Sequence, residues 1–383
     1  MDYSEFQVNI NEFDKEKLDG VSGILRVMND EEFLRTSIES SIGFLDELII
    51  VYNETTKKSI EIIQEMKRKY PEKIKVYKYL PKLYIGELNE KDYLYARSLP
   101  ENSIHLLANY CNYALSKCNY KYVMKIDSDQ VYFSNKMKLL TSLYKTEKSQ
   151  FKYKLGDFIS FFIYVLCMFC VLKLHLFNAE KFSVIFKKLY KGYFNGLLFF
   201  IEKFKIPVSL SGVNLFLPNK SNSAIYIPLG KSTKKSAHVP LPFNGIGDTA
   251  IFKLSSKVRF VPFESPAYNF ANARRYSIIE RLQNVGRLLP VGVCWAHFSA
   301  NREASIHKLQ AELESCPENF AMLKITSLDS LNLLRFSNSW ERYQANYYQM
   351  ILPSLNNQFL AWLTNFFIVN NEIRHKKLTK GGY

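Results

Sequence analysis

Two aspartates separated by a single serine, Asp127 and Asp129, directly follow the apolar segment YVMKI. In an extended chain, residues i and i+2 point to the same face, so we expect both carboxylates to project together from the end of one strand. Carboxylate oxygens are hard ligands that suit Mg²⁺ or Mn²⁺, and such a cation can in turn hold a nucleotide diphosphate. The alternative is an ordinary acidic turn after a buried strand.

The strand that carries these aspartates is the last of four apolar runs in the first 135 residues, and the segments between the runs have helical spacing. We predict strands at 22–27, 47–52, 73–79 and 122–127, and helices at 30–44, 57–70 and 104–117. Alternating strands and helices predict crossover connections and a mostly parallel sheet. The pattern therefore indicates the α/β class.

Polar residues gather where three of the predicted strands end. They are the cluster at 26–31, the pair Asn53 and Glu54, and the aspartate pair. In a parallel sheet, ligands bind outside the carboxyl ends of the strands. Neither a P-loop nor a Gly-x-Gly-x-x-Gly motif follows the first strand, so phosphate binding would depend on a metal ion and cationic side chains. The three clusters together predict a pocket for a ligand with a base, a ribose and a diphosphate.

The same strand ends carry a family resemblance. The segments GILRVMNDEEFL, IIVYNETT and YVMKIDSDQVY resemble nucleotide-sugar glycosyltransferases of the GT-A fold, family 2-like. The layout is similar, more narrowly, to bacterial lipooligosaccharide and O-antigen transferases, including β-1,4-N-acetylgalactosaminyltransferases. The resemblance implies an α/β fold with a Rossmann-like, mostly parallel central sheet. It is good over residues 20–135, patchy over 207–300 and absent elsewhere, and the Asp-Gly-Ser-x-Asp turn of many members is missing after the second strand.

The resemblance also implies roles for single residues. It places Asp127 and Asp129 at a Mn²⁺ or Mg²⁺ ion, and Lys125 either contacts phosphate or only balances the two carboxylates. The residues assigned to the nucleotide sugar are Arg26, Asn29, Asn53, Glu54, Lys125 and Asp127. Those assigned to uridine, which are Asn29, Asn53 and Glu54, are the ones that the missing turn affects.

Two later segments complete the implied site. VGVCWAHFS resembles the segment in which many GT-A enzymes supply a histidine as a further metal ligand, which makes His297 the candidate. The alternative is a histidine that is buried in the core or held by hydrogen bonds. Beyond it, Arg302 and Lys308 either neutralise the leaving diphosphate or belong to a solvated face.

Asp248 is the candidate catalytic base. It follows two glycines and precedes an apolar stretch that we expect to be helical. Its position is similar to that of the acidic residue that inverting GT-A enzymes use as general base, and a hydroxyl nucleophile needs such a group to accept its proton. The alternative is that Asp248 only caps a helix that begins at Thr249.

The middle of the chain is basic and apolar. The whole chain has a formal net charge of +15, and residues 135–205 contain 13 Lys and 4 Asp or Glu. These lysines alternate with Phe, Tyr, Leu and Ile, which favours an anionic membrane surface over nucleic acid. Residues 158–172 carry no charge but fall short of the ~20 residues of a spanning helix, and a Lys-edged segment follows at 182–204. We predict a helical hairpin on or in the bilayer surface; a helix pair in the core or at a dimer contact is the alternative.

We expect four regions in the chain. They are a nucleotide-sugar-binding half (1–135), a helical, membrane-facing insertion (136–206), an acceptor-binding half (207–310) and a helical C-terminal region (311–383). The first 20 residues show no signal-peptide pattern, and the six cysteines form no disulfide framework. These features predict a cytoplasmic protein, peripheral on the inner face of the cytoplasmic membrane.

The function that these features predict is metal-dependent transfer of a hexose or N-acetylhexosamine from a UDP-sugar to a glycan or glycolipid acceptor. The acceptor would be a bacterial surface glycan (lipopolysaccharide, lipooligosaccharide or capsule), and transfer would invert the anomeric configuration. Two alternatives remain open at this point. One is a nucleotidyltransferase, which also uses paired aspartates, and the other is a non-catalytic scaffold on the membrane surface.

Overall fold

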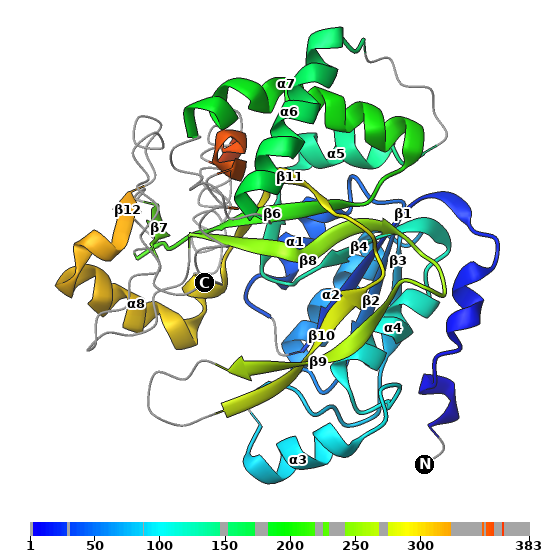
Figure 1. Cartoon of the computed structure of the whole chain (residues 1–383). Helices are drawn as coiled ribbons and strands as arrows, with labels where there is room; N and C mark the ends of the chain where they lie inside the picture. The colour runs from blue at the N-terminus through cyan, green and yellow to red at the C-terminus, as the bar shows by residue number, and fades with distance from the viewer. Residues whose placement is uncertain are drawn as a thin grey trace, which may run out of the picture.

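The computed structural model describes most of the chain, which is drawn in Figure 1. The described residues are 3–28, 31–86, 88–145, 152–172, 183–218, 225–229, 242–267, 275–322, 347, 350–355 and 362–363.

An eight-stranded mixed sheet runs through the molecule, with the order β3-β2-β1-β4-β8-β6-β11-β5. The strands are β1 (Leu18–Val27), β2 (Glu47–Tyr52), β3 (Ile74–Lys78), β4 (Tyr120–Ile126), β5 (Gln130–Tyr132), β6 (Val208–Asn214), β8 (Phe243–Lys253) and β11 (Leu289–His297). Strands β3, β2, β1 and β4 are parallel, which is the order of a mononucleotide-binding half in doubly wound folds. These four strands confirm the predicted ones to within a few residues.

Helices cover both faces of the parallel half. The helices α1 (Leu34–Ser41) and α2 (Lys57–Lys69) lie over one face, and α4 (Leu107–Ser116) lies over the other with the short helices η1 (Ser4–Phe6) and η2 (Ile10–Asp14). Successive strand residues serve the two faces in turn, since Leu25 and Leu48 pack with α1 and α2 while Ile24 and Ile49 pack with α4. All three predicted helices are confirmed, although α1 is shorter than expected.

Strand β8 contradicts one prediction. It pairs antiparallel with β4 on one side and β6 on the other, so the apolar stretch after Asp248 is a strand and the expected helix is wrong. Periodicity alone does not separate a short buried strand from a helix, and here sheet pairing on both edges decides for the strand. The register with β6 shifts between Leu210 and Gly212, which places the backbone of Asp248 in a bulge.

Two small antiparallel ribbons lie outside the main sheet. One pairs β9 (Arg259–Ala267) with β10 (Arg275–Gln283) and packs against α4 and α3 (Glu90–Ser98). The other pairs β7 (Tyr226–Pro228) with β12 (Phe320–Met322) beside α8 (Glu303–Ser315) and the short helices η4 (Ser299–Asn301) and η5 (Pro317–Asn319). The first ribbon reaches the carboxyl end of β1.

The helical insertion is confirmed as helical. Helix α5 (Ser134–Ser142) is followed by α6 (Leu155–Leu172) and α7 (Ser183–Phe204), and the last two pack as an antiparallel pair at the top of Figure 1. In the region 311–383, the structure describes the end of α8, η5, β12 and η7 (Leu352–Ser354). Most of the predicted C-terminal helical region lies outside the described residues.

Candidate functional site

The candidate site lies at the carboxyl edge of the parallel strands. Strand β1 has β2 and β3 on one side and β4 on the other, so the order of the strands reverses between β1 and β4. Open α/β sheets bind their ligands in the crevice at such a reversal. The chain places Arg26 at the end of β1 and Lys125 and the aspartate pair at the end of β4.

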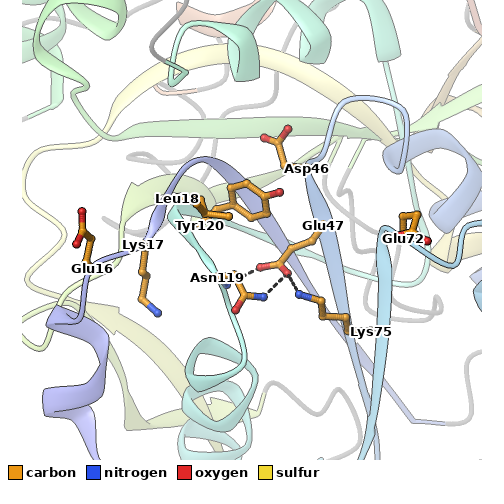
Figure 2. A pocket seen from close by; sticks show the side chains of 9 residues that line it. All are labelled: Glu16, Lys17, Leu18, Asp46, Glu47, Glu72, Lys75, Asn119 and Tyr120. Carbon is orange, nitrogen blue, oxygen red and sulfur yellow. Dashed lines mark hydrogen bonds and ion pairs between the residues drawn. The ribbon is translucent and has the colours of Figure 1, made fainter.

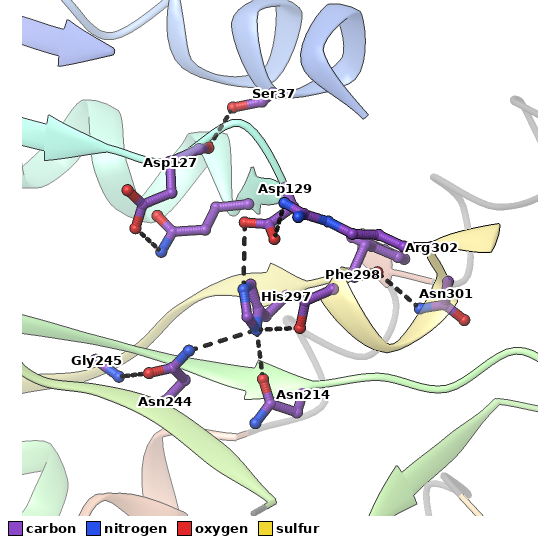
Figure 3. Close-up of polar contacts among 12 residues, drawn as sticks. Ser37, Asp127, Asp129, Asn214, Asn244, Gly245, His297, Phe298, Asn301 and Arg302 are labelled. Carbon is purple, nitrogen blue, oxygen red and sulfur yellow. Dashed lines mark hydrogen bonds and ion pairs between the residues drawn. The ribbon is translucent and has the colours of Figure 1, made fainter. Parts of the chain in front are cut away.

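The two aspartates do not share a strand face. Strand β4 ends at Ile126, so Asp127 and Asp129 lie in the turn that follows, where the alternation of an extended chain no longer applies. Figure 3 shows the two carboxylates directed to different partners. The expectation that both project together from one strand end is therefore wrong, and each aspartate has its own environment.

Asp127 lies beside two cationic side chains. Its Oδ1 is 3.5 Å from Arg26 Nη2 and 3.9 Å from Lys125 Nζ, and its Oδ2 accepts a hydrogen bond from Gln130 (3.0 Å). Both cations also contact Glu280 Oε1, at 2.8 Å from Arg26 and 3.1 Å from Lys125. These contacts form a cluster of two cations and two carboxylates in which Lys125 and Glu280 are buried.

Glu280 was not predicted from the sequence. It lies in β10, more than 150 residues after β4 along the chain, and the ribbon of β9 and β10 brings it to the end of β1. The only local sign was a carboxylate that directly follows two isoleucines in a strand-like segment. A charge in such a position needs a buried partner, but nothing nearby in the sequence named Arg26 and Lys125 as the partners.

Asp129 is the centre of a second group of contacts. Its Oδ1 is 3.2 Å from His297 Nε2, and its Oδ2 is 2.9 Å from Arg302 Nη2. Burial by itself raises the pKa of Asp129, but the hydrogen bond and charge of His297 and the charge of Arg302 hold that pKa below its ordinary value. Asp129 is therefore an ionised carboxylate at neutral pH.

Strand pairing explains why His297 reaches the aspartates. After the turn, the chain enters β5, which pairs with β11 so that Gln130 is opposite His297. The predicted approach of His297 and Arg302 to the aspartate pair thus rests on a contact between β5 and β11 that spans more than 160 residues. Phe33 stacks on Phe298 at 5.5 Å between ring centroids, which joins the segment before α1 to the same place.

The orientation of His297 leaves one nitrogen directed at Asp129. Asn214 Oδ1, an acceptor, is 2.6 Å from Nδ1 of His297, so this contact assigns the proton of the neutral ring to Nδ1. Nε2 can then either donate a proton to the Asp129 carboxylate, in the ion pair that lowers the pKa of Asp129, or lose that proton and share a cation with the carboxylate. Two acceptors that face each other are stabilised by a proton or a cation between them, and one nitrogen plus one carboxylate oxygen is a donor set that suits Mn²⁺.

The residues present thus fit a divalent cation at Asp129 and His297. The third predicted ligand, Asp127, is directed instead at Arg26 and Lys125. Among the described residues, no three His, Cys, Asp or Glu side chains are gathered as in a complete metal site. Metal binding therefore stays a prediction, with water and substrate oxygens needed to complete the coordination.

The residues predicted to lie near uridine have different surroundings. Asn53 is buried, and its Nδ2 donates to the carbonyls of Tyr79 (2.8 Å) and Pro81 (2.9 Å), so it fixes the segment after β3. Glu54 is exposed and has φ of 31°, a backbone conformation that non-glycine residues rarely adopt. Asn29 lies outside the described residues.

Two further predicted residues are Asp248 and Lys308. Asp248 is described only as part of the β8 backbone, so its role as a base stays a prediction. The same strand carries Asn244, whose Nδ2 is 3.4 Å from His297 Nδ1, and β8 therefore passes beside the site. Lys308 is exposed on α8, which agrees with the alternative that it belongs to a solvated face.

A cavity of about 490 Å³ lies at the opposite edge of the sheet, where the parallel strands begin. Figure 2 shows Glu47 at this cavity, bonded to Lys75 and Asn119. The Glu47 carboxylate is also bonded to Ser22 (2.7 Å), so its hydrogen-bonding capacity is taken up within the protein. We interpret this cavity as a structural feature of the amino edge, because ligands of such sheets bind at the carboxyl edge.

No protein-family model matches this sequence, and no curated protein matches it. Among solved structures, the chain is similar to the crystal structure of glucosyl-3-phosphoglycerate synthase from Mycobacterium tuberculosis in complex with Mn²⁺, uridine diphosphate and glucosyl-3-phosphoglycerate. The two are 14% identical with a TM-score of 0.22, over 44% of this chain and 54% of that chain. The chain thus matches about half of that protein's length, and a likeness this low supports no conclusion on function.

Proposed function

We propose that this chain is a metal-dependent glycosyltransferase that moves a hexose or an N-acetylhexosamine from a UDP-sugar to a bacterial surface glycan, namely lipopolysaccharide, lipooligosaccharide or capsule. The main support for the proposal is how the charged side chains are arranged between β1 and β4, where the order of the strands reverses. One carboxylate of the turn faces Arg26 and Lys125, and the other faces His297 and Arg302. A diphosphate requires cations and a divalent cation requires oxygen and nitrogen ligands, and this edge offers both side by side.

The roles of the donor-binding residues follow from their contacts. Asp129 and His297 would hold the metal ion, which when bound acts as a Lewis acid on the leaving diphosphate. Arg26 and Lys125 would bind the phosphate oxygens from the side of β1 and β4. Arg302 lies beyond Asp129 and would neutralise charge that develops on the leaving group.

The acceptor would enter from the second half of the sheet. Its hydroxyl oxygen would attack the anomeric carbon while the bond from that carbon to the diphosphate oxygen breaks, which inverts the configuration. The hydroxyl proton would pass to Asp248, the carboxylate of β8. The position of β8 supports this role, since Asn244 of the same strand contacts His297. The surface glycan as acceptor rests on the family resemblance of residues 20–135.

A panel of nucleotide sugars with Mn²⁺, scored for slow release of UDP, tests the proposal. Asp129→Asn keeps the size of the side chain but removes the charge that binds the cation, and we expect at least about 100-fold slower hydrolysis, in keeping with a metal contribution of several kcal/mol. Asp127→Asn should slow hydrolysis as well. Asp46→Asn is the matched control, because Asp46 is also a partly buried, ion-paired carboxylate (2.7 Å to Lys145) but lies at the amino edge.

Full activity in both Asp127→Asn and Asp129→Asn would reject the proposal. Calorimetry with UDP and Mn²⁺ distinguishes the proposed enzyme from the alternative of a non-catalytic scaffold. If UDP shows no metal-dependent binding to the wild type, the protein is better described as a non-catalytic scaffold.

A further inference from the structure

Helix α6 exposes an unbroken apolar face. Leu155, Ile159, Phe162, Leu166 and Phe169 are between 40% and 76% exposed, and their spacing of three or four residues places them along one side of the helix. Single exposed apolar residues are common on protein surfaces, but a stripe along an entire helix marks an interaction site. Within the described residues, α6 is also the one helix that is long and apolar enough to cross a membrane by length and composition.

The opposite face of α6 is fixed to the protein. Phe161, Tyr164 and Met168 belong to the main core, and the Tyr164 hydroxyl donates to the carbonyl of Met350. The partner helix α7 is tied to β11, since Tyr190 and Tyr193 donate to the carbonyls of Val291 (2.7 Å) and Pro290 (2.8 Å). Lipid cannot surround a helix held in this way, so its apolar face fits the surface of a bilayer and not its full depth.

The contact between α6 and α7 is unusually close. A Cβ atom on Gly192 would lie 2.5 Å from Ser160 Cβ, and one on Gly196 would lie 2.6 Å from Phe161 Cβ. Gly192 and Gly196 are four residues apart, and so are Gly156 and Ser160 on the facing helix. Small residues at this spacing let helices approach closely without needing large apolar side chains between them. The five side chains of the exposed stripe lie outside this contact.

The same hairpin also carries exposed lysines. Lys187, Lys188 and Lys191 are exposed on α7, and Lys152 and Lys154 are exposed just before α6. The two acidic residues of the described hairpin, Asp157 and Glu202, are less exposed than these lysines. Their carboxylates accept hydrogen bonds within the protein, from Asn195 and from the Tyr153 hydroxyl respectively. The exposed charge of the hairpin is therefore positive, which is complementary to anionic lipid headgroups.

We infer that the hairpin of α6 and α7 docks on an anionic phospholipid bilayer, with the apolar face of α6 in the interface and the lysines at the headgroups. The occupant of this face is lipid and not a second copy of the chain, because the exposed charge of the hairpin is positive and two hairpins in a symmetric contact would repel each other. Strand β11 runs from the hairpin contact at Val291 to His297 over six residues, about 20 Å. A bilayer at α6 would thus hold a lipid-linked acceptor close to the proposed site.

Flotation of the full chain with phospholipid vesicles tests the inference without measuring sugar transfer. We expect binding to vesicles that contain phosphatidylglycerol and much weaker binding to pure phosphatidylcholine. Phe162→Glu with Leu166→Glu should lower partitioning about 100-fold or more, because each side chain contributes about tenfold when buried. Leu94→Glu is the matched control, since Leu94 is 53% exposed on α3, at the other end of the molecule in Figure 1. Replacing Lys187, Lys188 and Lys191 by Gln should lower binding about fivefold for each lysine.

Three results would overturn the inference. The first is a wild type that stays unbound with phosphatidylglycerol vesicles, and the second is a Phe162→Glu, Leu166→Glu variant that floats as well as Leu94→Glu. The third is a wild-type dimer that this double variant converts to a monomer without loss of vesicle binding, which would identify a second copy as the occupant. Circular dichroism confirms that each variant is folded. UDP release by the soluble variants is expected to be unchanged, so loss of docking and failure of the proposed activity remain distinguishable.

Discussion

Replacement of Glu280 by Gln would test the charge cluster at the candidate site. Glu280 is 8% exposed and contacts Arg26, which is 14% exposed, and Lys125, which is 5% exposed. Asp127 also contacts both cations, but it is farther away, at 3.5 and 3.9 Å. Glu280→Gln preserves the volume of the side chain and removes its charge. Arg26 and Lys125 then lose the nearer of these two carboxylates.

The expected loss of stability is large. Removal of one partner from a buried ion pair costs about 3–5 kcal/mol, because the remaining charge is left uncompensated. For a chain of 383 residues, that corresponds to a fall in Tm of roughly 4–6 °C. UDP with Mn²⁺ should raise the Tm of Glu280→Gln by more than it raises the Tm of the wild type, since a diphosphate would supply the missing negative charge and ligand binding to the folded state adds to its stability.

Thermal unfolding with and without UDP and Mn²⁺ measures both effects. Glu264→Gln is the control, because Glu264 lies in the same ribbon and pairs with Arg97 at 3.1 Å but is 52% exposed, where an ion pair contributes about 1 kcal/mol or less. A Glu280→Gln variant as stable as this control would show that the cluster is well solvated. A destabilised variant with no added response to UDP would show that Arg26 and Lys125 are structural and would reject their assignment to phosphate.

Two further predictions concern stability away from the site. Burial alone raises the pKa of Glu47, but the Asn119 backbone N–H and Lys75 hold that pKa below its ordinary value of 4.5. The ionised Glu47 carboxylate therefore stabilises the folded state above pH 4.5, and this stabilisation is lost as the pH falls further. We expect Glu47→Gln to be about 2–3 kcal/mol less stable than the wild type at pH 7. In urea titrations, the free energy of unfolding of the wild type should fall below about pH 5, whereas that of Glu47→Gln should not show this fall. Parallel pH profiles of the two proteins would contradict this prediction. Gly212→Ala places a Cβ 1.8 Å from a ring carbon of buried Trp295 and should cost at least about 1–3 kcal/mol. Gly43→Ala, with its nearest contact at 3.7 Å, is the control, and equal Tm values would refute the packing argument.

The parallel half of the fold could be predicted because its signals are local. The strands β1 to β4 and the helices α1, α2 and α4 each show their own hydrophobic period within a few residues, and short connections leave little choice of partner. The hairpin of α6 and α7 was predictable for the same reason. Signals of this kind fix the elements, and the crossover rule predicts a mostly parallel sheet; the order of the strands comes from the structure.

The second half of the fold was harder to predict for a physical reason. The apolar run after Asp248 is short, and only its pairing with β4 and β6 makes it a strand. The direction of the aspartate pair depended on the position at which β4 ends, at Ile126, since only a strand that continued through Asp129 would have kept both carboxylates on one face. Strand ends are set by tertiary contacts, here by the turn into β5 that pairs with β11.

The residues of the candidate site also differ in whether the sequence could identify them. His297 was named by resemblance, and the structure shows its contact with Asp129, whereas Glu280 had no motif to identify it. A motif records residues that are close in sequence, but the partner of a buried cation can come from any strand that the fold brings near. Buried charges such as Lys125 are therefore useful markers, because each one requires a counter-charge that the sequence does not locate.

The charge of the whole edge also indicates which ligands belong together. Arg26, Lys125 and Arg302 face Asp127, Asp129 and Glu280, so the formal charges of these six side chains balance without any ligand when His297 is neutral. A nucleotide-sugar diphosphate alone would add negative charge beside three carboxylates, and a divalent cation alone would add positive charge beside three cationic side chains. A diphosphate and a divalent cation together leave the balance unchanged. This balance of charge favours binding of the two ligands together over binding of either alone, which is what the proposed metal-dependent transfer from a nucleotide sugar would require.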